Sequence, residues 1–229
     1  MQKLRIALLE DDPDQAELIN AWLEAAGHHC VKFKAGMELI RKLRSDSFDL
    51  LMIDRILPDM DGMEVMSWIR RNYDQAIPII FVTVIGNEEE IVKALDGGAD
   101  EYLVKPIGLR ELEARINAMF RRVAYQTMEN RLEYAPYSID RTTQRIEFAD
   151  QFVDLTQKEY ELAVFMFNNE GRILSRKHIL ESVWGKNGEL NTRTVDTHMS
   201  RIRKKLILGP ENGWVLKSIY QHGYRLERY

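Results

Sequence analysis

The sequence predicts an α/β fold in which a doubly wound, five-stranded parallel sheet is followed by a second, smaller α+β domain. Two observations lead to this expectation. In the first half, short apolar runs alternate five times with helical patterns, and in the second half short strand-like runs flank three helical patterns. Alternating strands and helices favour a parallel sheet that is covered on both faces. A chain of 229 residues is long enough for two such domains, each with its own core.

The first half consists of five strand and helix pairs. The first two pairs are RIALL with DQAELINAWLEAA and CVKF with MELIRKL, and the third is LLMI with GMEVMSWIRR. The last two are IIFV with EEEIVKAL and EYLV with LRELEARINAMFRR. The short, nearly continuous apolar runs are typical of strands that are buried on both faces. We therefore assign residues 1–122 to the first domain.

A more polar stretch, AYQTMENRLEY, separates the two halves and has no clear apolar face. We assign residues 123–133 to a linker and residues 134–229 to the second domain. Within the second domain, YSID, RIEF and FVDL predict a small antiparallel sheet, and WVLKSI with GYRLERY predicts a closing hairpin.

Three helices are expected between these strands. Thr156 and Glu159 have the spacing of a capping box that opens the first helix, and Gly171 is placed to follow its end. Ser175 can cap the second helix. The third runs from about Asn191 to Leu206.

The composition excludes several classes of protein. With 45% hydrophobic and 30% charged residues, the chain has the make-up of an ordinary globular protein. Its first residues, MQKLRIALLEDD, have only a short apolar core followed by acids, which favours a buried strand over a signal peptide or a membrane span. We expect a cytoplasmic protein without a membrane partner. The single cysteine, Cys30, excludes an intrachain disulfide.

The net charge of −4 is divided unevenly between the halves. Residues 1–122 carry 16 Lys and Arg against 22 Asp and Glu, whereas the rest of the chain carries 16 against 14. Between Arg172 and Lys205 there are nine basic residues and three acids. This local excess of positive charge suits a polyanionic partner, and the acidic first half does not.

Polar residues follow most strands of the predicted parallel sheet. Glu10 and Asp11 follow the first strand, Asp54 the third and Lys105 the fifth, and Thr83 closes the fourth. Ligands of such sheets bind at the carboxyl ends of the strands. Neighbouring carboxylates stay ionised only with a cation, and Mg²⁺ prefers such oxygen ligands. A lysine and a hydroxyl can hold phosphoryl oxygens, so the set predicts phosphoryl transfer to an aspartate.

These residues stand in motifs that resemble the receiver domain of two-component response regulators, which has a flavodoxin-like fold. The motifs are LLEDD, DLLMIDRILPDMDG, IIFVT and GADEYLVKP. The resemblance implies that Asp54 is the phosphoacceptor, assisted by Thr83 and Lys105, and that Tyr102 is the switch aromatic. It also implies that Mg²⁺ is bound by Asp11, Asp54 and the carbonyl of Ile56, with Glu10 acting through water.

The last predicted helix has two different faces. Val195, Met199, Ile202 and Leu206 form one apolar stripe for the core. The residues that fall away from this stripe are basic or hydrogen-bonding: Thr194, Thr197, His198, Arg201, Lys204 and Lys205. A helix with such a face can enter the major groove of DNA, although an isolated basic run is more often a solvated surface.

Four segments decide whether the last helix binds DNA or is a solvated surface: LTQKEYEL, GRILSRKHILESVWG, RTVDTHMSRIRKKL and HGYRL. Their order resembles the winged helix-turn-helix domain of the OmpR/PhoB family. The resemblance makes the last helix the recognition helix, with Arg201 contacting bases, and places Tyr224 in the wing. It implies backbone contacts by Trp184, Arg193, His198 and Arg203. At the tip of the wing, where the family has a basic residue, this chain has Tyr220, Gln221 and His222.

The combined resemblance implies a response regulator that controls transcription. Its expected partners are a sensor histidine kinase, double-stranded DNA with tandem half-sites, RNA polymerase and, after phosphorylation, a second copy of the chain. Residues that match the family's dimer face are Lys93, Asp100, Glu101, Glu111 and Arg115. Ile91 stands where the family commonly has a basic residue, unless Lys93 replaces it, and Val84 stands where the family has a smaller one.

Two other functions are compatible with parts of this pattern. Some metal-dependent phosphohydrolases also form a phosphoaspartate, but they carry a further acid two residues past the nucleophile, where this chain has Ile56. A DNA-binding protein regulated without phosphate would not need the set of Asp11, Asp54, Thr83 and Lys105. We expect no enzymatic role in the usual sense.

Overall fold

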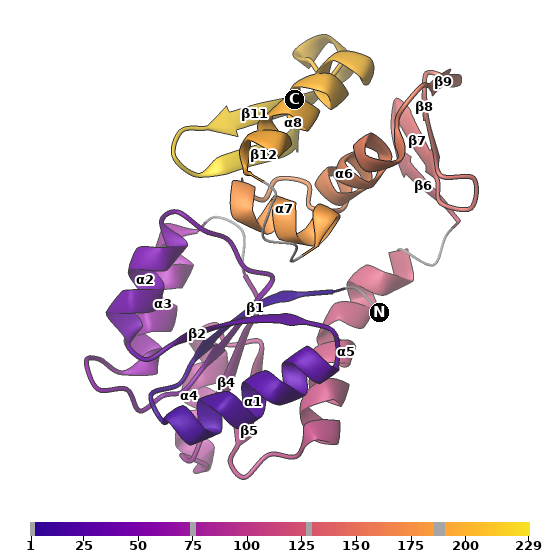
Figure 1. The fold of residues 1–229 in the computed structure, drawn as a ribbon. Coiled ribbons are helices and arrows are strands. Elements are labelled where there is room, and N and C mark those ends of the chain that lie inside the picture. The colour runs from indigo at the N-terminus through magenta and orange to yellow at the C-terminus, as the bar shows by residue number, and fades with distance from the viewer. Residues whose placement is uncertain (1–2, 74–76, 127–129, 186–190) are drawn as a thin grey trace. The chain divides into compact units, whose positions relative to one another are not determined.

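The computed structural model describes residues 3–73, 77–126, 130–185 and 191–229, with only the backbone of residues 121–126. The chain forms two compact units, Met1–Met119 and Phe120–Tyr229. Figure 1 draws the first in indigo to magenta and the second in pink to yellow. No helix in the described ranges combines the length and the apolarity needed to cross a lipid bilayer.

The first unit alternates strands and helices as the sequence predicts. Its strands are β1 (Arg5–Leu9), β2 (His29–Phe33), β3 (Leu50–Ile53), β4 (Ile79–Thr83) and β5 (Glu101–Val104). Its helices are α1 (Pro13–Ala25), α2 (Gly36–Leu43), α3 (Gly62–Asn72), α4 (Glu88–Asp96) and α5 (Leu109–Gln126).

The sheet has the strand order β2-β1-β3-β4-β5, and all its pairings are parallel. Because the order reverses between β1 and β3, the connections that leave these two strands diverge and open a crevice at their carboxyl ends. Every residue of β1, β3 and β4 is buried, which is the burial expected for central strands covered on both faces. The fold therefore confirms the predicted doubly wound sheet.

The helices of this unit are anchored to different degrees. α2 and α3 each bury four residues, and three of the four in each helix pack with the sheet in one hydrophobic cluster. Within α4, Ala94 is the one fully buried residue. An element with little buried apolar surface opens at low free-energy cost, so α4 is the least firmly held of the three.

The second unit begins with an antiparallel sheet of β6 (Arg131–Tyr134), β7 (Tyr137–Asp140), β8 (Arg145–Phe148) and β9 (Gln151–Val153). Three helices follow, α6 (Gln157–Asn168), α7 (Arg176–Trp184) and α8 (Arg193–Lys205), with a short 3₁₀ helix, η1 (Pro210–Asn212). The closing sheet has the order β10-β12-β11, formed by β10 (Leu174–Ser175), β11 (Trp214–Ile219) and β12 (Gly223–Arg228).

Aromatic side chains join the layers of the second unit. The ring of Phe167 on α6 lies 5.3 Å from that of Tyr137 on β7 and 5.1 Å from that of Trp214 on β11. The buried hydroxyl of Tyr137 donates to the carbonyl of Leu206, 2.7 Å away, at the end of α8. Burial raises the pKa of Tyr137 to about 12, so this hydroxyl stays a donor at neutral pH.

The stretch expected to be a linker is largely structured. α5 continues to Gln126, and β6 starts at Arg131, so residues 123–126 are helical and residues 131–133 belong to a strand. The remaining part of the predicted linker includes residues 127–129, which lie outside the described residues. β6 is an edge strand with one inward residue, Leu132, which faces Ile139 of β7. A single buried residue leaves no periodicity that could identify a strand beforehand.

The helix caps agree with the sequence analysis. Thr156 and Glu159 form the expected capping box at the start of α6, and the Ser175 hydroxyl accepts from the His178 N–H at 3.0 Å. Glu159 also accepts from the Lys205 ammonium at 2.7 Å, which links the start of α6 to the end of α8. Burial would raise the pKa of Glu159, but the bonds from Lys205 and from the Thr156 N–H lower it below its usual value.

We predict that Glu159→Gln destabilises the second unit by about 1–3 kcal/mol at neutral pH, because it removes a buried, charge-assisted hydrogen bond. Since the folded pKa is depressed, this stabilisation is present above the unfolded pKa and is lost as the pH falls through the folded value. Hydrogen exchange at the amides of α6 and α8 in the full chain measures the effect. Glu161→Gln, at a more exposed pair with Lys158, is the matched control. Equal losses in both variants, or a Glu159→Gln effect that persists at low pH, would contradict the prediction.

Candidate functional site

The carboxyl ends of four strands bring the predicted polar residues to one edge of the sheet. Glu10 directly follows β1, Asp54 follows β3, and Lys105 follows β5, while Thr83 is the last residue of β4. The register aligns these ends, since Leu9 pairs with Ile53 and Thr83 pairs with Val104. Parallel strands that end at the same edge therefore bring Glu10, Asp54 and Lys105, which are distant in sequence, into contact with one another.

Lys105 joins the two buried acids of this edge. Its ammonium lies 2.5 Å from Asp54 Oδ2 and 2.7 Å from Glu10 Oε2. Glu10 is 2% and Asp54 7% exposed. Burial raises the pKa of Glu10 despite the hydrogen bond from Lys105, whereas the two carboxylates raise the pKa of Lys105 although burial alone would lower it. The site is a compact set of charges with one positive group between two acids.

Thr83 places a hydroxyl group at the same edge of the sheet. Its hydroxyl is buried and has no hydrogen-bond partner among the residues that the structure describes. Buried hydroxyls are nearly always paired, so an unpaired one beside a charged edge fits a ligand oxygen as its partner. Asp54 Oδ1 accepts from the Ile56 N–H at 3.1 Å, which orients the carboxylate. An oxygen-rich anion held by Lys105 and Thr83 suits this geometry.

The predicted metal ligands follow β1 and β3 at this edge of the sheet. Asp11 is exposed, and the side chain of Ile56 is 55% exposed. In the portion of the chain that the structure describes, no group of three or more His, Cys, Asp or Glu side chains has a metal-binding arrangement. Lys105 takes the charge-compensating position between Glu10 and Asp54.

Tyr102, the expected switch residue, lies inside the first unit. It is 8% exposed, and its hydroxyl donates to the carbonyl of Ile85 at 2.8 Å. This bond connects β5 to the loop between β4 and α4. Burial raises the pKa of Tyr102, which keeps the hydroxyl protonated. Val84, in the same loop, is 60% exposed beside Thr83.

Arg55 was not singled out from the sequence. It directly follows Asp54, is buried, and forms ion pairs with Asp61 at the start of α3 and with Glu90 on α4. The signal that could have indicated it is a cation directly after the phosphoacceptor position in LLMIDRIL, followed by acids at helix starts.

Four of the five residues expected at a dimer face have partners within the chain. Arg115 lies 3.3 Å from Glu101 and 3.6 Å from Glu111. Asp100 accepts from Arg70 at 3.0 Å and from the Ile79 N–H at 2.8 Å, an arrangement that the sequence did not indicate. Lys93 is exposed on α4, and Ile91 packs partly against the core.

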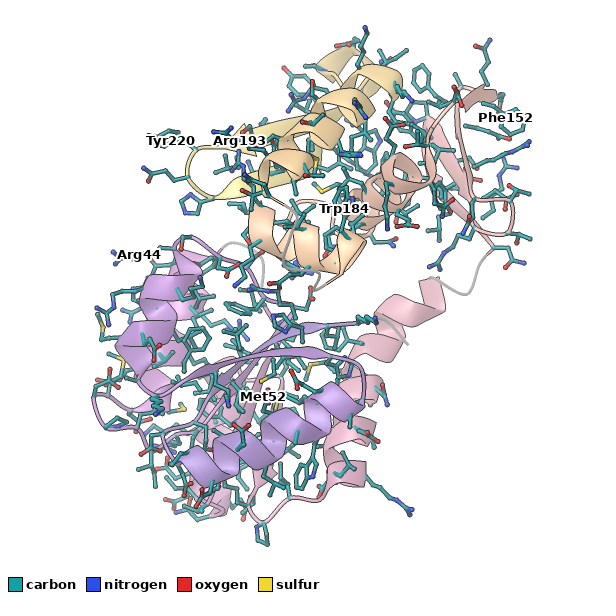
Figure 2. All side chains as sticks on the ribbon, in the orientation of Figure 1. Arg44, Met52, Phe152, Trp184, Arg193 and Tyr220 are labelled. Atoms are coloured by element: carbon teal, nitrogen blue, oxygen red, sulfur yellow. The ribbon has the colours of Figure 1, made fainter. Side chains whose placement is uncertain are left out.

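In the second unit, α8 presents the two expected faces. Val195, Met199 and Ile202 are buried, and so is Leu206 at the helix end. The opposite side is accessible to different degrees: Arg193, Thr197, Arg201 and Lys204 are exposed, whereas Thr194, His198 and Arg203 are half-buried. Figure 2 shows Arg193 among the side chains that extend from this unit.

Several predicted DNA-contacting residues also hold the helix in place. Arg203 donates to the carbonyl of Leu216 on β11 at 2.8 Å. Tyr224 on β12 donates to Asp196 on α8 at 2.6 Å, and Arg176 donates to the same carboxylate oxygen at 2.8 Å. The contacts of Asp196 and Arg176 were not expected from the sequence. They fix α8 against the wing and the start of α7.

Trp184 and His198 meet between the two helices. Their rings are 5.1 Å apart at an angle of 72°, an edge-to-face contact. The Nδ1 atom of His198 lies 2.9 Å from the carbonyl of Thr194. Both rings are half-buried, so each keeps an accessible edge while it packs α7 against α8.

Comparison with known proteins agrees with both units. Residues 6–117 match the family "Response regulator receiver domain", and residues 150–226 match the family "Transcriptional regulatory protein, C terminal". A solved two-component response regulator from Clostridium difficile is 32% identical, with a TM-score of 0.50, over 53% of this chain and 98% of that chain.

Full-length relatives extend the similarity over nearly the whole chain. The phosphate regulon transcriptional regulatory protein PhoB of Rhizobium meliloti is 34% identical over 97% of this chain and 98% of its own length. PhoB of Escherichia coli is 32% identical over 96% of each chain. With both domains in the same order as in these relatives, the chain belongs to the OmpR/PhoB family of two-component response regulators, whose receiver domain controls transcription through phosphorylation.

Proposed function

We propose that this response regulator is switched by transfer of a phosphoryl group from a sensor histidine kinase to the carboxylate of Asp54. The observation that carries the proposal is the Lys105 ammonium 2.5 Å from Asp54, next to the unpaired, buried hydroxyl of Thr83. In the reaction, an Asp54 oxygen forms a bond to phosphorus while the bond from phosphorus to the kinase histidine nitrogen breaks. Lys105 and the Thr83 hydroxyl bind the phosphoryl oxygens, and Lys105 stays protonated because its acids raise its pKa.

Receiver domains bind Mg²⁺ as a class, and the ligand chemistry of this chain fits it. Asp11, Asp54 and the Ile56 carbonyl would hold the ion directly, and Glu10 would act through water. All of these are oxygen donors, as Mg²⁺ requires. When bound, the ion supplies positive charge to the phosphoryl oxygens. Tyr102, through its bond to Ile85, would report the change at Asp54 to the loop between β4 and α4.

We further propose that α8 is the recognition helix for double-stranded DNA with tandem half-sites. Arg201 is exposed near the middle of the polar face and would contact base edges, with Thr194 and Thr197 beside it, whereas His198 would contact the DNA backbone. Arg193 and Lys204, also exposed, would meet phosphates, together with Trp184, Tyr224 and the free part of the Arg203 guanidinium.

The remaining partners follow from this scheme. Phosphorylation would promote a homodimer through α4, β5 and α5, with Lys93, Asp100, Glu101, Glu111 and Arg115 at its face. A dimer on tandem half-sites would present two copies of the second unit to RNA polymerase. DNA as the target and a kinase as the donor are consistent with a protein that works in the cytoplasm. The role is regulatory, and hydrolysis of the phosphoryl group by the receiver itself would set how long the regulator stays phosphorylated.

We predict that Asp54→Asn abolishes labelling by acetyl phosphate, because an amide is not a competent nucleophile. Removal of Mg²⁺ with a chelator should have the same effect. Intact-protein mass spectrometry of the full chain measures the labelling. Asp14→Asn, which changes an exposed acid of α1, is the matched control and should label normally. Full labelling of the Asp54 variant would place the phosphoacceptor elsewhere.

A second prediction separates base reading from phosphate contact. Arg201→Ala should cost about 1–3 kcal/mol on a selected site and relax the preference at one base position. Arg193→Ala should weaken binding to all sequences alike and reduce the salt dependence by roughly one unit. Arg193 is the better phosphate probe than Arg203, which already binds the Leu216 carbonyl. Salt titrations on selected and random DNA measure both effects, with Lys177→Ala as the control.

The same measurement tests the spacing of the half-sites. Two recognition helices on one face of the duplex need half-sites about 10–10.5 base pairs apart, or a multiple of that. Inserting about half a turn should abolish cooperative binding and leave single-site affinity unchanged. If Arg201→Ala keeps its sequence preference, α8 is not the reading element.

A third prediction concerns the dimer. Arg115→Glu should lower the mass of the phosphorylated protein in sedimentation, because it reverses a charge at the proposed symmetric face and leaves three acids together there, since Arg115 contacts Glu101 and Glu111 of its own chain. Folding should be preserved, since Arg115 is exposed and such pairs contribute only about 0–1 kcal/mol. Arg110→Glu on the same helix is the matched control. An unchanged phosphorylated mass for Arg115→Glu excludes this face.

A further inference from the structure

Arg55 lies where three elements of the receiver meet. It is the residue after Asp54, it is 8% exposed, and its guanidinium contacts acids from two helices. Nε lies 3.4 Å from the Asp61 carboxylate, which caps α3, and Nη1 forms an ion pair with Glu90 in the first turn of α4. The pair thus links the phosphoacceptor segment directly to α4.

α4 has few other attachments. Ala94 is its one fully buried residue, while Val92 and Leu95 are 48% and 42% exposed. A helix with so little buried apolar surface lies at the low end of local stability, so one ion pair between the buried Arg55 and the half-buried Glu90 contributes a large share of what holds it. The loop that precedes α4 carries Ile85, whose carbonyl is bound by Tyr102. Movement of α4 therefore also moves the chain that follows Thr83.

We propose that Arg55 is a positioning residue that couples the charge on Asp54 to the position of α4, through an ion pair with Glu90 that holds α4 in the unphosphorylated arrangement. Phosphorylation replaces one negative charge on Asp54 by about two. The adjacent guanidinium is shielded from water, so it is drawn toward the added charge more strongly than an exposed side chain would be. Glu90 then loses its partner, and α4 is released.

This inference rests on the proposed phosphorylation of Asp54 and adds to it a specific transmitter. The competing explanation is that the pair only stabilises the fold. The two explanations differ in one respect. A purely structural ion pair stabilises α4 equally before and after phosphorylation, whereas a coupling ion pair stabilises α4 only before phosphorylation. Such a difference is a coupling between two sites, which a cycle of variant and phosphorylation state measures.

The test compares wild type, Glu90→Gln and Glu89→Gln in the full chain by hydrogen exchange over the segment from Ile85 to Asp96, with and without acetyl phosphate and Mg²⁺. Glu89 is the matched control, since it is an exposed acid in the same helical turn. Without the phosphodonor, Glu90→Gln should accelerate exchange by at least about fivefold, and Glu89→Gln should not. With the phosphodonor, exchange in wild type should become as fast as in Glu90→Gln, and exchange in Glu90→Gln should become only slightly faster than it is without the phosphodonor.

Two further readouts keep the test decisive. Glu90→Gln should be labelled faster by acetyl phosphate than wild type, because release of α4 favours the conformation that phosphorylation stabilises. The double variant Arg55→Gln with Glu90→Gln should exchange as Glu90→Gln alone does. Equal acceleration of exchange by Glu90→Gln in both phosphorylation states, or none in either, overturns the proposed coupling through the Arg55–Glu90 ion pair. Absence of labelling in wild type overturns the proposed function instead, so the two failures are distinguishable.

Discussion

The ammonium of Lys105 lies between two buried carboxylates at the carboxyl edge of the parallel sheet, and the rest of the receiver is arranged around this contact. Glu10 and Asp54 follow β1 and β3, and Lys105 follows β5, so one side chain compensates acids that come from across the sheet. Two carboxylates at these positions would otherwise repel each other in a low-dielectric environment. In the proposed function, the same three charges would also form the reactive site, so that stability and reactivity would share one group of residues.

The receiver and the effector unit use buried polar contacts for different purposes. In the receiver, three charged side chains gather at the carboxyl edge of the sheet. In the effector unit, the carboxylate of Asp196 joins Arg176 and Tyr224 and thereby holds α8 to α7 and β12. Arg176 neutralises this acid, and the first turn of a helix favours negative charge. Arg193 and Arg201, on the same helix, remain exposed.

Several arginines make contacts within the protein that the sequence does not indicate. Arg70 donates to the carbonyls of Gly98 and Ile77 and to Asp100, Arg203 donates to the carbonyl of Leu216, and Arg55 bridges two helix starts. Each guanidinium satisfies several acceptors at once, which a planar fork of donors does well. In the sequence these residues look like any exposed cation. Their direction depends on which carbonyls and carboxylates the fold leaves without donors.

The sequence by itself determined the order of strands and helices in the receiver, because buried parallel strands are continuous apolar runs and helices have a 3.6-residue period. It also placed Glu10, Asp54, Thr83 and Lys105 at one edge, since strand ends of a parallel sheet coincide, and it located the capping box of α6 and the apolar stripe of α8. Tertiary structure alone decided which acids Lys105 binds, that the Thr83 hydroxyl is unpaired, and that Asp100 is held by Arg70. It also decided that Leu132 and the two residues of β10 belong to strands, because their pairing partners lie elsewhere in the chain and short edge strands carry no periodic signal of their own.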